Sequence, residues 1–212
     1  MTSFREAAVG LGRPARVLDF DVECRPSAWY AGDWCSKEIT AIAWRFIDEP
    51  EKATRVWLLT PSLTLASHRR KKKEGLEVFL QDYREADMVT GHFIRGFDLP
   101  LMNGALIRAG LPSLGTKMSH DTKTDLIRMS GLSKSQENLG AYFDLKHDKQ
   151  HMNNHLWEIA NTLVREGREE TRRRCVGDVN QHIEFRQELI RRGALQPPSA
   201  WRPGARAEKY HP

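Results

Sequence analysis

The sequence predicts an α/β fold with one central mixed β-sheet of about five strands, flanked by helices. Three segments rich in β-branched and aromatic residues follow one another within the first 60 residues, separated only by short polar breaks. A further short apolar segment comes after a helical pattern, and the rest of the chain is mainly helical. This order favours an α/β arrangement, with an α+β arrangement as the alternative.

The first three strands are expected to form an antiparallel meander. Residues 16–24 are rich in apolar β-formers, and residues 39–47 alternate in polarity. A turn at 48–52 then leads into a third strand at 54–60. Short turns of this kind join neighbouring antiparallel strands.

The later elements follow from helical spacing and from the positions of proline and glycine. A helix is expected over 76–83, a buried strand over 88–92, and a helix from Pro100 that Gly110 ends. The remaining segments are, in order, a strand or loop at 117–122, the start of a helix at 121–129, and helices at 135–143, 157–166 (ended by Gly167) and 168–192.

The length fits one large domain or two small ones, and the absence of a linker pattern favours one globular domain. The 212 residues are 40% apolar and 29% charged, which is the usual balance of a folded, water-soluble chain. We expect a loose lead-in over 1–15 and the domain over 16–195. The segment 196–212 is dominated by Pro, Ala, Arg and Gly, which predicts a disordered tail.

Charge and cysteine content narrow the function classes. The 33 basic and 28 acidic residues give a net charge of +5, which is compatible with nucleic acid as a partner. Three cysteines without a CxxC pair argue against a zinc ribbon and fit a reducing compartment. We see no apolar run of signal-peptide or membrane-span length, so we expect a cytoplasmic protein with no membrane partner.

The first acidic motif lies at the end of the first expected strand. Asp21 and Glu23 are two residues apart, so their side chains leave the same face of a strand. Asp19 shares this parity and competes for the same role. A calcium loop starting at Asp19 is disfavoured, because its sixth position is Cys24 instead of glycine.

Two further acidic residues stand in separate stretches. Asp98 lies in the stretch Gly-His-Phe-Ile-Arg-Gly-Phe-Asp-Leu-Pro that begins at Gly91, and Asp178 follows Cys175 on the long charged helix. A helix N-cap is the alternative role for Asp98, and a solvated helix face is the alternative for Asp178. Carboxylates that converge from distant segments can hold two hard divalent cations on a phosphodiester.

The three motifs together resemble the DEDD exonuclease superfamily, the DnaQ-like group with a ribonuclease H-like fold. The second motif is most similar to the proofreading exonuclease domains of family B DNA polymerases and their stand-alone phage and bacterial relatives. The resemblance spans roughly residues 16–192. It implies a 3′–5′ exonuclease in which Asp21, Glu23, Asp98 and Asp178 are catalytic and hold two Mg²⁺ or Mn²⁺ ions.

The third motif departs from this family. The family places a tyrosine four residues, or a histidine five residues, before the final aspartate to orient the attacking water. Here these positions are Arg174 and Arg173, and arginine stays protonated, so neither is a general base. A histidine from elsewhere (His151, His155 or His182) supplies the role, the metal activates water without a base, or the site is slow or inactive. Arg174 is also a candidate contact of the scissile phosphate.

Other residues are candidates for substrate binding. Phe97 either wedges against a base or packs under the sheet, and Trp29 either stacks on terminal bases or packs in a core cluster. His92 is either a hydrogen-bonded core histidine or a substrate contact. A basic run, Arg69 to Lys73, is expected in a loop that grips phosphates or is simply solvated.

The expected partner is DNA, with single-stranded 3′ ends as the preferred substrate and a replication polymerase as a protein that such a nuclease can accompany. Two rivals remain: an exoribonuclease of the same fold, and a non-catalytic nucleic-acid-binding module with a degenerate site. The Arg-, Ala- and Gly-rich composition suggests a bacterial or phage source.

Overall fold

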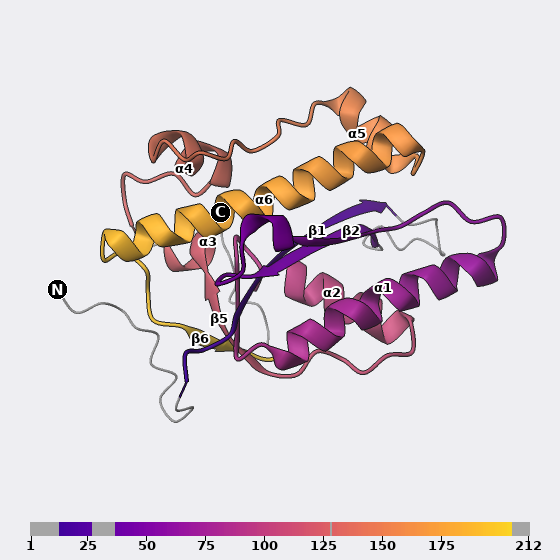
Figure 1. Cartoon of the computed structure of the whole chain (residues 1–212), viewed down its shortest axis with the longest axis horizontal. Helices are drawn as coiled ribbons and strands as arrows, with labels where there is room; N and C mark the ends of the chain where they lie inside the picture. The colour runs from indigo at the N-terminus through magenta and orange to yellow at the C-terminus, as the bar shows by residue number, and fades with distance from the viewer. Residues whose placement is uncertain (1–12, 27–36, 128, 205–212) are drawn as a thin grey trace.

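A six-stranded mixed sheet forms the centre of the molecule (Figure 1). The computed structural model describes residues 13–26, 37–127 and 129–204. The strands are β1 (Val17–Pro26), β2 (Lys37–Phe46), β3 (Arg55–Leu58), β4 (Met88–Gly91), β5 (Lys117–Asp121) and β6 (Ser199–Trp201). Their order is β3-β2-β1-β4-β5-β6. The β1–β4 and β4–β5 pairs are parallel and the other three are antiparallel.

Helices cover both faces of this sheet. Figure 1 shows α1 and α2 on one face and the long α6 crossing the other. The helices are α1 (Leu65–Glu85), α2 (Asp98–Arg108), α3 (Thr122–Asp125), α4 (Gln136–Tyr142), α5 (Asn154–Asn161) and α6 (Arg165–Arg191), with a 3-10 turn, η1 (Glu51–Ala53), before β3. The predicted α/β class is confirmed, with one strand more than expected.

β1 has two chemically different faces because its side chains alternate. Its residues in the large apolar core with α1 and α2 are Leu18, Phe20 and Val22. Its acidic residues have the opposite parity, which is the face on which α6 packs. Ala41 and Ala43 of β2 lie beside Glu23 and Asp21 in the sheet and pack against Cys175 of α6. These small side chains let α6 approach the acidic stretch of β1 closely.

The sheet opens where β1 and β4 part. β4 pairs only with Val17–Asp19 of β1, so the following residues of β1 have no strand on that side within the described part of the chain. The chain leaves β4 at Gly91 and enters α2 at Asp98, beside this open edge. Open α/β sheets often place their ligands where neighbouring strands diverge at their carboxyl ends.

The basic run lies in a helix, so the prediction of a loop for residues 69–73 is wrong. α1 begins at Leu65, and Thr64 caps it by accepting a hydrogen bond from the Ser67 N–H at 3.2 Å. The first buried residue of the helix is Gly75, so its first half projects beyond the core. Periodicity misses such a segment because it has no apolar face, although Lys and Arg favour helix.

The predicted helix ending at Gly167 is also wrong. α5 ends at Asn161, and α6 starts at Arg165 after a turn in which Leu163 has φ = 61°. Gly167 lies inside α6, where an added Cβ would stand 2.1 Å from the Ile159 carbonyl oxygen. Glycine is needed here for the close approach of α5 to α6 and not to end a helix.

The expectation of a disordered tail does not hold for residues 199–201. They form β6 and pair with β5 at the sheet edge. Trp201 is 9% exposed and belongs to the large core. The packing of Trp201 in the core holds this Pro- and Ala-rich segment against the domain.

Candidate metal centre

Three of the four predicted carboxylates come together between β1 and α6. Asp21 and Glu23 reach the site from β1 and Asp178 from α6, with one oxygen of each within 4.8 Å of the others. The period of two along β1 places the first pair on one face. The close packing of α6 on β2 then brings Asp178 to them. Such a set of hard oxygen donors suits Mg²⁺ or Mn²⁺.

Asp98 joins this group from α2. It is the first residue of the helix, and its Oδ1 accepts a hydrogen bond from the Val22 N–H at 3.1 Å, between Asp21 and Glu23. The N-cap position belongs to Phe97, so the alternative of Asp98 as the N-cap is wrong. Its carboxylate instead accepts a hydrogen bond from the backbone of β1, and its negative charge raises the pKa of Asp21.

The four carboxylates repel one another. Burial, and then the charges of Asp178, Asp98 and Glu23, raise the pKa of Asp21 well above its usual range. Burial raises the pKa of Glu23 to about 7, against the opposing effect of Arg174. Burial likewise raises the pKa of Asp98 to about 8, although the Val22 N–H opposes this. A divalent cation would relieve this excess of negative charge.

Two buried oxygens in the cluster have no hydrogen-bond partner among the described residues. They are Asp21 Oδ2 and Asp178 Oδ1. Buried carboxylate oxygens are nearly always satisfied by a donor or an ion. Their position within the acidic group therefore fits a metal ligand set.

Two cations reach into the cluster from the α6 side. The Lys149 ammonium lies 2.9 Å from Asp178 Oδ2. Sequence reasoning missed Lys149, because a single lysine in the polar segment 146–155 carries no pattern that distinguishes it from a solvated loop residue. Contacts of His147 with α6 hold this segment in place. The His147 carbonyl accepts a hydrogen bond from the Gln181 side chain, and Nδ1 of the His147 imidazole lies 2.8 Å from Glu184 Oε1.

Arg174 is the second cation and sits inside the site. Its Nε donates to Glu23 Oε1 at 2.7 Å, and its Nη2 lies 3.6 Å from Asp178 Oδ2. Its Nη1 donates to the Gln150 carbonyl at 2.8 Å, and the guanidinium lies over the Trp157 ring at 5.3 Å. Arg174 is therefore a positive charge held inside the acidic group.

The loop before Asp98 is held by Asp121, which sequence reasoning also missed. The fully buried Asp121 carboxylate accepts hydrogen bonds from the N–H groups of Phe93 and Arg95 at 2.9 and 2.8 Å. Phe93 has φ = 74°, a conformation that costs a non-glycine residue energy. Arg95 also bridges to Asp125 at 2.7 Å. Asp121 thus holds the loop at Phe93 and Arg95, ahead of Asp98.

Phe97 lies at the rim of the site next to Asp98. It is partly exposed, packs against the large core, and has the Lys37 ammonium 4.6 Å from its ring centre. Its position agrees with either of its two predicted roles. Trp29, the other aromatic candidate, lies outside the described residues.

His92 belongs to a buried polar chain beneath the cluster. Its Nε2 lies 2.9 Å from the Lys134 carbonyl and its Nδ1 lies 3.0 Å from the Thr122 hydroxyl. Burial lowers the pKa of His92 to about 3, so the neutral ring donates from Nε2 and accepts the Thr122 proton at Nδ1. These contacts favour the core-histidine alternative over a substrate contact.

The same chain accounts for His182 and Asp19. His182 Nε2 lies 2.9 Å from Thr122 Oγ1, and its Nδ1 lies 2.6 Å from Asp19 Oδ2. Asp19 Oδ2 is thus paired with His182, and Asp19 is not one of the three carboxylates that meet between β1 and α6.

The other histidines considered as bases lie at the surface. His151 is exposed, 3.8 Å from Glu137, and His155 is exposed on α5. The partners of His182 are Thr122 and Asp19, neither of which is one of the four clustered carboxylates. The arrangement gives no support to a histidine base.

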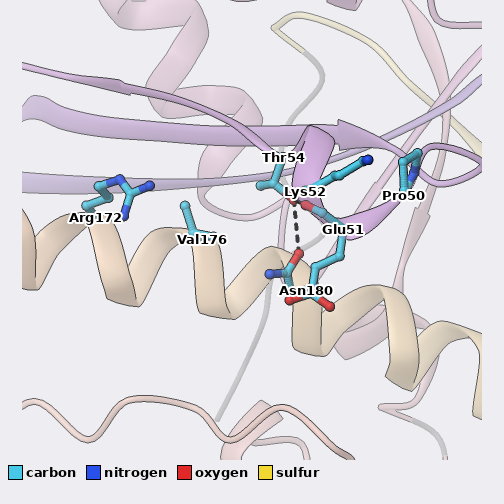
Figure 2. Close-up of a pocket in the computed structure, with 7 residues that line it drawn as sticks. All are labelled: Pro50, Glu51, Lys52, Thr54, Arg172, Val176 and Asn180. Atoms are coloured by element: carbon cyan, nitrogen blue, oxygen red, sulfur yellow. Dashed lines mark hydrogen bonds between the residues drawn. The ribbon is translucent and has the colours of Figure 1, made fainter.

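A separate hollow lies between α6 and η1 (Figure 2). Its volume is about 520 Å³, and its lining residues are Pro50, Glu51, Lys52, Thr54, Arg172, Val176 and Asn180. The Thr54 hydroxyl donates to Asn180 Oδ1 across it at 3.1 Å. The hollow does not include the carboxylates, so the candidate site is the acidic cluster and not this pocket.

Comparison with known proteins supports the fold. No family model and no curated protein matches the chain. Among solved structures, it is similar to the family B DNA polymerase from the hyperthermophilic archaeon Pyrobaculum calidifontis, with a TM-score of 0.62 and 18% sequence identity. The match covers 84% of this chain and 25% of the polymerase chain. At this identity the likeness shows a shared fold, and it agrees with the ribonuclease H-like architecture that the resemblance implied.

No described helix is long and apolar enough to cross a membrane.

Proposed function

We propose that this chain is a metal-dependent 3′–5′ exonuclease that removes nucleotides from DNA ends. The observation that carries the proposal is the meeting of Asp21, Glu23 and Asp178, with Asp98 beside them and two buried oxygens that no described donor reaches. The DNA polymerase named in the structural match supports DNA as the substrate. Single-stranded ends fit best, because a terminal phosphodiester must reach carboxylates that lie largely buried between β1 and α6.

The ligand set would be Asp21, Glu23, Asp98 and Asp178, holding two Mg²⁺ or Mn²⁺ ions during the reaction. When bound, such ions supply positive charge against the phosphate and lower the pKa of the attacking water. The reaction joins the oxygen of this water to phosphorus and breaks the bond from phosphorus to the 3′-oxygen, which releases a nucleoside 5′-monophosphate.

The protein's own groups position this reaction. Lys149 and Arg174 add donors and positive charge near the phosphate. Phe97 offers a partly exposed ring at the rim, on which a terminal base can stack. Asp121 and the 93–97 loop hold Asp98 against the backbone of β1.

The test follows the shortening of 5′-labelled single-stranded DNA and RNA in Mg²⁺, Mn²⁺ or EDTA. Asp178→Asn removes one charge with little change of shape, and Asp48→Asn, at the exposed turn after β2, is the matched control. We expect a DNA ladder that shortens from the 3′ end and is abolished by EDTA and by Asp178→Asn, but not by Asp48→Asn. Shortening of RNA alone would identify an exoribonuclease.

A non-catalytic nucleic-acid-binding module is the second candidate. The observation that favours it is the ion pairing of Arg174 with Glu23, a carboxylate that the exonuclease needs for metal. Retained DNA binding without release of any nucleotide, in either metal, would support this module and contradict the proposed exonuclease.

A further inference from the structure

Three basic side chains meet on one carboxylate at the end of the sheet, beyond the acidic stretch of β1. Glu38, near the start of β2, accepts the Arg25 Nε–H at 2.9 Å through Oε2. Its Oε1 lies 2.8 Å from His68 Nε2 and 2.9 Å from Lys72 Nζ. Arg25 stands opposite Glu38 in the β1–β2 pair, whereas His68 and Lys72 belong to α1. This cluster therefore fastens the projecting half of α1 to the end of the sheet.

The cluster carries more positive than negative charge. Burial would raise the pKa of Glu38, but the hydrogen bonds with His68, Lys72 and Arg25 outweigh it and lower this pKa to about 2. Glu38 therefore supplies one negative charge at every working pH. Among the described residues, neither Arg25 nor Lys72 pairs with a second carboxylate. Even with a neutral His68, one positive charge is left without a counter-charge.

This excess charge is held in a fixed and partly shielded place. The side chains of Arg25 and Lys72 are only 25% and 20% exposed, and the Asn161 carbonyl of α5 accepts a further hydrogen bond from Arg25 at 2.7 Å. Contacts with described residues use three of the five N–H donors of Arg25 and one of the three of Lys72. The remaining donors can reach an anion, and a charge that is already ordered and shielded attracts it more strongly than a mobile surface lysine does.

The cluster lies on a path that leads away from the metal centre. Arg25 is two residues beyond Glu23 on β1, at a rise of about 3.4 Å per residue. Lys37, the neighbour of Glu38 in the chain, lies over the Phe97 ring at the rim of the site. Figure 1 shows the start of α1 at the same end of the molecule as the end of β1. A strand whose terminal base lies on Phe97 would pass Lys37 and reach this cluster.

We propose that Arg25 and Lys72, held in place by Glu38, bind an internucleotide phosphate of the substrate strand on the 5′ side of the scissile bond. This inference rests on the proposed function for the direction of the strand, because the 3′ end is placed at the carboxylates. It makes Arg25 and Lys72 substrate contacts and Glu38 a positioning residue. Strands too short to reach the cluster should therefore bind weakly.

The test replaces one phosphate at a time by an uncharged methylphosphonate along a 5′-fluorescein-labelled oligothymidine. Fluorescence anisotropy measures its binding to the full-length chain, with Ca²⁺ in place of Mg²⁺ and a gel to check that the strand stays intact. For the wild type we expect one position on the 5′ side of the terminal linkage to weaken binding by about tenfold, the lower end of the range for a hydrogen bond to a charged group. Lys72→Gln should bind the unmodified strand about tenfold more weakly and be insensitive at that position, because both changes remove the same contact.

Lys73→Gln is the matched control. Lys73 is exposed and pairs with Glu77, so this variant should keep the positional effect whatever its overall affinity. Equal losses at every phosphate of the strand with the wild type would overturn the inference, and this measurement does not depend on any variant folding. A folded Lys72→Gln protein with the wild-type profile would also overturn it. The nuclease assay on the same preparations is a separate readout: cleavage without a positional effect refutes the inference alone, whereas a positional effect without cleavage refutes the exonuclease alone.

Discussion

In the metal-free protein, burial and mutual repulsion make it unfavourable for the carboxylates of the metal centre to ionise. In the unfolded chain Glu23 and Asp98 titrate near 4.5 and 3.8, whereas in the folded chain their pKa values are about 7 and about 8. Between these limits the folded state holds more protons than the unfolded state. The free energy of unfolding therefore falls as pH rises through this window.

We expect the metal-free protein to be more stable at pH 5 than at pH 8. One pKa unit corresponds to about 1.4 kcal/mol, so the loss across the window is on the order of a few kcal/mol. Thermal unfolding in EDTA at several pH values measures it. Asp98→Asn should flatten the profile, because it removes one of the carboxylates whose pKa is raised by folding, and a profile that rises from pH 5 to pH 8 would contradict the argument.

Residues of the site differ in how far the sequence predicts them. Asp21 and Glu23 follow from strand parity alone, and Asp98 and Asp178 follow from motifs that resemble a family. Lys149 and Asp121 do not, because their partners lie 29 and 28 positions away along the chain, in contacts that no local pattern encodes. Arg174 stands out in the sequence only as a departure from the family, and its ion pairs come from the packing of α6 on β1.

At the scale of elements, two features need more than periodicity to explain them. α1 extends beyond the core as a basic helix. α6 contains two glycines, Gly167 and Gly177, whose surroundings differ. Gly167 allows α5 to touch α6, whereas a Cβ at Gly177 would meet no described atom within 4 Å. The sequence predicts that Gly167 ends one helix and that Gly177 lies inside the next, and only the neighbouring backbone shows that both belong to α6.

Gly167→Ala and Gly177→Ala should therefore change stability in opposite directions. The first puts a Cβ against the rigid backbone of Ile159 and should destabilise by about 1–3 kcal/mol. The second should stabilise by up to about 1 kcal/mol, because alanine favours helix more than glycine does. Urea denaturation of the two variants measures both. Equal effects would mean that the α5–α6 approach does not depend on glycine.

The exposed basic face of α1 should contribute to DNA binding but not to stability. Replacing Arg69, Arg70 and Lys73 by glutamine should leave the urea midpoint nearly unchanged, because these side chains are exposed. The affinity for single-stranded DNA should fall, and the slope of log K against log salt should decrease by about 0.7 for each phosphate that the variant no longer neutralises. Fluorescence anisotropy over a salt series measures this.

Arg84→Gln, at the other end of α1, is the control for that experiment and should bind DNA like the wild type. An unchanged salt slope in the triple variant would mean that the basic run is solvated and does not contact DNA phosphates.

At the scale of the whole molecule, the sheet ends in an edge strand, β6, that no sequence pattern predicts. The α/β class and most of the first five strands follow from apolar alternation and turns. β6 has three residues in a Pro- and Ala-rich segment, so it is too short to show the alternation of polarity that predicts a strand. It is specified by tertiary contacts, since Trp201 enters the same core as the residues of α1 and α2.

Trp201→Ala should therefore destabilise the entire domain and not merely loosen its end. Truncating a large buried aromatic residue costs about 3–5 kcal/mol; a residue at the edge of the core should lie near the lower value. Arg202→Ala removes an exposed neighbour and is the matched control. Unfolding followed by both tryptophan fluorescence and far-ultraviolet circular dichroism should show one transition, shifted to lower urea for Trp201→Ala only. An unchanged midpoint would mean that β6 adds nothing to the core, and the domain would then end where the predicted tail begins.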